Sequence, residues 1–245
     1  MHPSCGTLVV GTCNDGGMAA AADSAHGQGS DPMHERLIAA ATDLLAHSGP
    51  SEIKVRRITE AAGVSTIAVY HHFGGLAELL QAVVNRGYLL LREAFDRAAG
   101  ADPDPGVQLF AMALSTRDIA QRNPHLYDMM FGLSTRGTYR YVGEKARADP
   151  SAYFHEAYSV LVGACDRLVG SGRIDVSDPE QVAAELWSAV HGFVTLEAAS
   201  HFARFDDPVL SVLAPMAINH FVGMGDTRSR AERSAAAALA WWEAK

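Results

Sequence analysis

The side chains best suited to contact a nucleic acid gather in RITEAAGVSTIAVYHHF, residues 57–73. Thr66 and His71 carry polar groups that can hydrogen-bond to the edges of DNA bases. Ile67 and Ala68 offer methyl groups, which suit contact with the methyl groups of thymine. These residue types in one short stretch indicate readout of a duplex, with a preference for T-rich positions in the half-site.

Three cations, Lys54, Arg56 and Arg57, lie just before this stretch or at its start. Their charges can neutralise phosphates, which sets affinity and register but not sequence preference. If all three engage DNA in each half of a dimer, binding should weaken with salt with a slope of about −5 on log axes. Residues 65–73 hold no Arg or Asn, so no bidentate contact to a base is expected.

Two short helices, over 54–62 and 65–73, are expected to position these side chains. Ile58, Ala61 and Ala62 form the apolar face of the first helix, and the second helix turns its own apolar residues toward it. A pair of helices this short must be joined by a tight turn.

Gly63 permits that turn, because a glycine adopts backbone conformations that a Cβ disfavours. Ser65 follows at the N-cap position, where its hydroxyl can accept a hydrogen bond from an unpaired backbone amide. Val69 and Phe73 are four residues apart and share the inner face of the second helix, so its other side chains point outward. The arrangement is a helix-turn-helix, whose second helix reads the major groove.

The segment GVSTIAVYHHF resembles the turn and recognition helix of TetR-type transcriptional repressors. The residues that match the family pattern are Ala62, Gly63, Val64, Ser65, Val69, Tyr70, His72 and Phe73. The resemblance extends back through MHERLIAAATDLLAHSG and forward through LAELLQAVVNRG, and covers about 31–97. It implies a dimeric repressor that leaves a palindromic operator when a small molecule binds.

The resemblance also assigns roles within the helix-turn-helix. Tyr70 and His72 stand at the family's backbone-contacting positions and are expected to hydrogen-bond phosphate oxygens. Two recognition helices about 34 Å apart, one from each subunit, would read the two halves of a palindrome. Leu76 departs from the family, because many members carry a phosphate-binding Lys there. This departure removes one charged contact per subunit.

Composition agrees with an all-α regulator. The 245 residues are 48% hydrophobic and carry a net charge of −8, which disfavours a non-specific nucleic-acid coat but not a small basic face on an acidic body. No apolar run approaches the roughly 20 residues of a membrane span, so no membrane partner is expected. Cys5, Cys13 and Cys165 have no metal-ligand spacing and fit reduced thiols in a cytoplasmic protein.

Helices are expected over 31–48, 54–62, 65–73, 76–98, 107–122, 124–131, 151–169, 179–202, 208–223 and at the C-terminus. Residues 1–30 are expected to be a disordered tail, 31–97 a DNA-binding domain, and 98–245 a ligand-binding and dimerisation domain. The Pro-rich segment 100–106 marks the boundary. Residues 132–150, rich in Gly and Arg, are expected to be partly irregular.

The expected helices over 179–202 and 208–223 are apolar on nearly all sides. Such helices must be covered on nearly all sides, so one face should pack on the subunit's own core and the other on a partner chain. With their two-fold mates they would form a four-helix dimer bundle.

A small hydrophobic or aromatic molecule is the expected effector, and no cofactor or metal is implied. Candidate pocket residues are apolar with a few hydroxyls: Phe110, Leu114, Tyr127, Met130, Tyr153, Phe154, Tyr158, Trp187 and His191. The segment WSAVHGF, residues 187–193, resembles a Trp/His-Gly subgroup of TetR-type proteins. His191 is then either the polar anchor of a ligand or a core histidine hydrogen-bonded to backbone.

Other classes of function remain to be weighed. No catalytic motif of a hydrolase, P-loop or dinucleotide-binding protein is present. A thiol redox sensor would depend on Cys165, which lies on an apolar stripe where thiols are usually inert. The main alternative is a dimeric ligand-binding adaptor with weak or lost DNA binding, which Leu76 and the weakly basic head favour.

Overall fold

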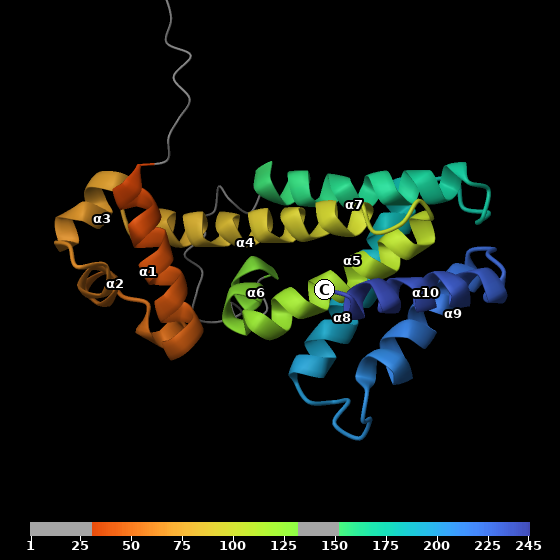
Figure 1. The fold of residues 1–245 in the computed structure, drawn as a ribbon. Helices are drawn as coiled ribbons and strands as arrows, with labels where there is room; N and C mark the ends of the chain where they lie inside the picture. The colour runs from red at the N-terminus through yellow and green to blue at the C-terminus, as the bar shows by residue number, and fades with distance from the viewer. Residues whose placement is uncertain (1–30, 132–151) are drawn as a thin grey trace, which may run out of the picture. The chain divides into compact units, whose positions relative to one another are not determined.

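The computed structural model describes residues 31–131 and 152–245, which form helices and no strand (Figure 1). The elements are α1 Pro32–Ser48, η1 Pro50–Glu52, α2 Val55–Ala62, α3 Thr66–Phe73, α4 Leu76–Ala99, α5 Pro105–Arg122, α6 Pro124–Phe131, α7 Ala152–Gly170, α8 Pro179–Ala198, η3 Val209–Leu213, α9 Ala214–Gly223 and α10 Arg228–Glu243. The all-α prediction is confirmed. The predicted tail 1–30 and irregular segment 132–150 lie outside the described residues.

The first three helices pack around a small apolar core. Leu37 of α1, Ile58 of α2 and Val69 of α3 are fully buried there, and Leu79 closes the core from the start of α4. This N-terminal group, which we call the head, is therefore held together by the same apolar positions that the sequence pattern indicates.

Helix α4 belongs both to the head and to the larger C-terminal group of helices, which we call the body. Its first turns pack against α1 and α3, and its later turns pack against α5 and α7 (Figure 1). Leu91 and Phe95 are buried in the later part. One unbroken helix of 24 residues thus connects the two groups.

Helix α5 forms the centre of the body. Every residue from Gly106 to Thr116 is buried, because α4, α6, α7, α8 and α10 all pack against this helix. Asp104 caps its first turn by accepting a hydrogen bond from the Gly106 amide at 2.8 Å. Pro105 occupies the first position of the helix, where an amide proton would have no partner within the helix, so its absence costs no hydrogen bond.

Arg173 fixes the start of α5 to two distant segments. Its guanidinium is buried and pairs with Asp104 and with Asp226, whose carboxylate is also buried. The Ser234 hydroxyl of α10 donates to the Asp104 carboxylate at 2.7 Å. The segment 100–106 is therefore tied to the α7–α8 connection and to α10.

Two predicted helices differ from those observed. The predicted helix over 179–202 ends at Ala198, because Ser200 adopts a left-handed conformation with φ 62° that breaks the helical path. The predicted helix over 208–223 is divided into a π-helical turn, η3, and α9. Pro215 near the start of α9 has no amide proton, so the regular hydrogen-bond ladder cannot run through it.

Helix α6 bridges the head and the body. The Tyr88 hydroxyl of α4 donates to the Met130 carbonyl of α6 at 2.7 Å. Gly87 allows this close approach, because a Cβ there would collide with the Met130 sulfur. The same short helix packs against α1. None of the helices in the described part of the chain is both long and apolar enough to cross a membrane.

Candidate nucleic-acid interface and ligand cavity

The turn between α2 and α3 has the geometry that the sequence predicts. Gly63 adopts a left-handed conformation (φ 63°, ψ 43°), and its amide donates to the Glu60 carbonyl at 3.1 Å. Ser65 occupies the N-cap position of α3, but its side chain makes no capping hydrogen bond. That predicted bond is wrong, and the exposed hydroxyl is left available to solvent or to a ligand.

The outer face of α3 is exposed and apolar in its middle. Ile67 is 73% exposed and Tyr70 is 59% exposed, whereas Val69 between them is fully buried. Thr66 and His71 are also exposed. An exposed aliphatic side chain contributes no burial energy to the fold, whereas a molecule that covered Ile67 would gain that energy.

Three residues of the helix-turn-helix differ in exposure from what the sequence predicts. Ala61 is exposed rather than on the inner face of α2. Ala68 is half-buried and packs against the head core, which reduces its reach toward a base. His72 is half-buried, and its ring lies edge-on to that of His71 with centroids 5.0 Å apart.

The three cations at the start of α2 are not equivalent. Lys54 and Arg56 are exposed, and Lys54 is the N-cap residue of the helix. Arg57 pairs with Glu52, with 2.8 Å between Nη1 and Oε2. Leu76 begins α4 and packs, half-buried, against the head core. The head therefore presents fewer unpaired cations than its sequence indicates.

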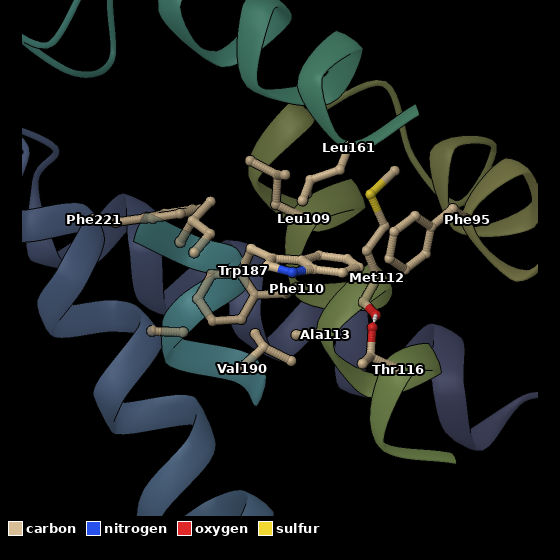
Figure 2. A pocket seen from close by; sticks show the side chains of 12 residues that line it. Phe95, Leu109, Phe110, Met112, Ala113, Thr116, Leu161, Trp187, Val190 and Phe221 are labelled. Carbon is tan, nitrogen blue, oxygen red and sulfur yellow. Dashed lines mark hydrogen bonds between the residues drawn. The ribbon is translucent and has the colours of Figure 1, made fainter. Parts of the chain in front are cut away.

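A small apolar cavity of about 40 Å³ lies inside the body (Figure 2). Its lining residues are Phe95, Leu109, Phe110, Met112, Ala113, Thr116, Leu161, Leu186, Trp187, Val190, Ala217 and Phe221. Of the predicted pocket residues, only Phe110 and Trp187 are among them. The Thr116 hydroxyl is already used, because it donates to the Met112 carbonyl at 2.9 Å.

Trp187 separates this cavity from a cluster of aromatic rings. Its centroid lies 4.2 Å from that of His191, 5.7 Å from Phe131, 5.4 Å from Tyr158 and 6.1 Å from Phe154. Four of the predicted pocket residues therefore meet here around or beside Trp187: Tyr127, Phe154, Tyr158 and His191. These rings come from α6, α7 and α8.

His191 is hydrogen-bonded to Tyr127 through its Nδ1 atom. Burial lowers the pKa of His191 to about 4, so the ring is neutral at pH 7. Burial also raises the pKa of Tyr127, which keeps its hydroxyl protonated. The hydroxyl therefore donates to Nδ1, and the proton of the neutral ring lies on Nε2.

The Nε2 atom of His191 is buried and has no hydrogen-bond partner within the described residues. A buried donor without an acceptor is costly, and such groups often mark the place of a ligand or water. Of the two predicted roles of His191, a core histidine bonded to backbone does not match these contacts, since its partner is a tyrosine hydroxyl.

The remaining predicted pocket residues lie elsewhere. Leu114 lines a separate void of about 10 Å³, Met130 packs against Gly87, and Tyr153 is exposed on α7. Sequence reasoning missed most of the cavity lining, in particular Leu109, Met112, Leu161 and Phe221. The unbroken apolar character of 109–114 was the available signal, because a helix without a polar face lies at the centre of a core.

A helix-turn-helix head on a larger helical body defines a class of DNA-binding regulators. Residues 37–83 match the family model described as bacterial regulatory proteins, tetR family. Residues 109–218 match the model described as tetracyclin repressor-like, C-terminal domain. Together the two matches span more than half of the chain, which belongs to the tetR family of transcriptional regulators. Comparison with curated proteins gives no match.

Solved structures share this fold. A protein of unknown function from Rhodococcus sp. RHA1 is 23% identical with a TM-score of 0.65, over 82% of this chain and 99% of that one. A tetR-family regulatory protein from Rhodococcus RHA1 is 18% identical with a TM-score of 0.59, over 81% and 100%. RolR in complex with resorcinol is 18% identical with a TM-score of 0.57, over 83% and 92%.

Proposed function

We propose that the protein is a homodimeric, cytoplasmic repressor that a small hydrophobic or aromatic molecule releases from a palindromic operator. The exposure of Ile67 and Tyr70 on α3 carries this proposal. The Ile67 side chain makes little contact with the rest of the head, whereas a thymine methyl in the major groove would cover it.

The other residues of the head take roles that follow from their positions. Thr66 and His71 flank Ile67 on the exposed face and would hydrogen-bond base edges. Tyr70 and His72 would bind phosphates together with Lys54 and Arg56.

Dimerisation through α8 and the segment that follows it is supported by what these elements leave uncovered. Ala184, Ser188 and Gly192 are exposed at intervals of four residues, which places three small residues on one face of α8. Leu196 continues the same face and is 44% exposed, and Leu210 of η3 is 57% exposed. Small residues allow two helices to approach closely, and the two leucines would be buried by a second copy.

The body offers a place for the effector but must open to admit it. The cavity of about 40 Å³ is far smaller than the roughly 150 Å³ that holds a benzene ring. Trp187 or Phe110 would therefore have to move. His191, which lies beside Trp187, would then donate from Nε2 to an oxygen of the ligand. The RolR complex with resorcinol supports a small hydroxylated ring as the first compound to test.

Helix α6 gives the effector a route to the head. Phe131 at its end lies against Trp187 and His191, and the helix packs on both α1 and α4. Displacement of Phe131 by a ligand would shift α6 and with it the head. Repression would end because the two recognition helices would no longer fit their half-sites together.

Fluorescence anisotropy against duplexes that tile the DNA upstream of the gene tests the DNA-binding part. We expect tight, sequence-selective binding to a two-fold-symmetric site. Replacing Tyr70 and His72 by Ala should weaken it about 30-fold or more, since each dimer would lose four phosphate contacts. Tyr153→Phe on α7, an exposed tyrosine away from the head, should leave affinity unchanged.

Uniformly weak binding to every duplex would instead support the dimeric adaptor. The observations that favour this alternative are Leu76 at the start of α4 and the pairing of Arg57 with Glu52. The two functions differ in one further result: an adaptor would keep its cellular activity when Tyr70 and His72 are replaced.

Sedimentation velocity tests the dimer. Gly192→Arg places a long cation on the exposed face of α8, where a Cβ meets nothing within 4 Å, so the subunit should fold but remain monomeric. Gly170→Arg is the matched control, because a Cβ at the end of α7 also meets nothing. A dimer that survives Gly192→Arg would show that the interface lies elsewhere.

A further inference from the structure

A second pocket, separate from the Trp187 cavity, lies between the later turns of α4, the later half of α5 and the C-terminal residues. Its volume is about 210 Å³, and it is lined by Leu90, Ala94, Arg97, Ser115, Asp118, Ile119, Arg122, Asn123, Trp242 and Lys245. None of these residues belongs to the recognition surface or to the aromatic cluster.

Positive charge exceeds negative charge in this pocket. Arg97, Arg122 and Lys245 line it, and Asp118 is the one carboxylate side chain among its lining residues. Asp118 is already engaged, because it accepts a hydrogen bond from Arg122 at 2.8 Å. Asp118 pairs with Arg122, and Arg97 forms no ion pair among the residues that the structure describes. Arg97 and Lys245 therefore line the pocket without an acidic side chain as ion-pair partner.

The lysine ammonium is held against aromatic rings rather than against an acid. Its Nζ lies 3.8 Å from the centroid of the Trp241 ring and 4.1 Å from that of Trp242. The pKa of Lys245 is lowered by partial burial and then by the like charges of Arg97 and Arg122, although Asp118 opposes this shift. A bound anion would relieve the repulsion among the three cations.

Ser115 provides a second, independent observation. This residue is 2% exposed, and its Oγ has no hydrogen-bond partner within 31–131 and 152–245. Each cation taken alone is explained by the helix end that it occupies, since positive charge is favourable at a helix C-terminus. That explanation does not account for an unpaired hydroxyl buried in the wall of the same pocket.

We propose that this pocket binds a small organic anion, a carboxylate carried on an apolar ring, with Arg97 as its main charged partner. Leu90, Ala94, Ile119 and the Trp242 ring would cover the apolar part. The volume suffices, because roughly 150 Å³ holds a benzene ring. The Ser115 hydroxyl would donate to the ligand, and the site is independent of the proposed repressor function.

Isothermal titration with benzoate tests the proposal, with benzamide as the neutral molecule of matched shape. We expect benzoate to bind and benzamide to bind at least tenfold more weakly, because the carboxylate receives charge-assisted hydrogen bonds. Arg97→Gln should weaken benzoate binding by about tenfold or more. Arg86→Gln, an exposed arginine on the same helix, should leave it unchanged.

Ser115→Ala tests the buried hydroxyl of the pocket separately from the exposed Arg97. The variant removes a hydroxyl without a partner, so the fold should be kept and benzoate should bind several-fold more weakly. Equal binding of benzoate and benzamide, no effect of Arg97→Gln, or no binding of benzoate at millimolar concentration would each overturn the proposal. Operator binding is measured separately and does not enter these outcomes.

Discussion

Glu52 holds Arg57, with 2.8 Å between the carboxylate Oε2 and the guanidinium Nη1. Both residues lie at the start of the helix-turn-helix, one in η1 and the other in α2. This ion pair engages one of the three cations that the sequence places there, so Arg57 is less available to a phosphate. With Lys54 and Arg56 alone engaged in each subunit, the salt slope of operator binding would be about −3.6 rather than about −5.4.

Releasing Arg57 should therefore strengthen DNA binding. We expect Glu52→Gln to raise operator affinity and to steepen the salt slope by about 1.8 in a dimer, while thermal stability changes little because exposed ion pairs contribute little. Anisotropy titrations at several salt concentrations measure both. Glu60→Gln, which removes an exposed carboxylate of α2 without freeing a cation, is the control. Identical slopes for the two variants would contradict the assignment.

Restoring a lysine at the start of α4 should have a similar effect. Leu76→Lys adds one phosphate contact per subunit, so the slope of log affinity against log salt should steepen by about 1.8. Leu76→Gln controls for the loss of apolar packing at this half-buried position. If Lys and Gln give the same affinity and slope, the position does not approach a phosphate in this protein.

His191 should make stability depend on pH in a defined window. Its folded-state pKa of about 4 is depressed below the unfolded value of about 6.5, so its contribution is complete above pH 6.5 and is lost as the pH falls toward 4. The loss at pH 5 relative to pH 7 is about 2 kcal/mol. Urea unfolding at the two pH values measures it.

Replacing the His191 imidazole separates its contribution to the pH dependence of stability from that of the other titrating groups. His191→Gln should remove about 2 kcal/mol of the difference between pH 7 and pH 5. His201→Gln, at an exposed histidine, should leave the difference as in the wild type. If His191→Gln leaves the difference in unfolding free energy between pH 7 and pH 5 unchanged, the ring is not buried in its neutral form.

Cys165 should be unreactive in the folded protein. Its side chain is fully buried, and burial raises the pKa of the thiol to about 12, so almost no thiolate exists near neutral pH. In a Cys5→Ser, Cys13→Ser background, a thiol reagent should label the chain only after unfolding in urea. Rapid labelling of the native protein would revive a redox-sensing role.

The head could be predicted from sequence nearly residue by residue. Gly63 and Val69 act through local backbone geometry and a four-residue period, and both behave as predicted. The errors concern the placement of individual side chains rather than the course of the backbone. Ala61 has the right residue type for a core but lies on the outer side of α2, and the Ser65 hydroxyl does not cap α3.

The body was harder to predict because its site depends on long-range packing. Trp187 and Phe110 could be identified as pocket candidates from residue type, but the cavity between them also needs Leu161 and Phe221 from other helices. The pairing of Arg173 with Asp104 joins residues 69 positions apart and leaves no local pattern in the sequence. Helix bounds followed periodicity to within two residues except where Ser200 and Pro215 interrupt it.

The length of α4 has a mechanical consequence. At 1.5 Å per residue its 24 residues span about 36 Å, so it acts as a lever between the two groups of helices that it joins. A tilt of about 3° at its body end would move its other end by about 2 Å, which exceeds the tolerance of roughly 0.5 Å within which a hydrogen bond keeps its geometry. The proposed release from DNA would therefore need only a small displacement beside Trp187, because the length of α4 amplifies it at the head.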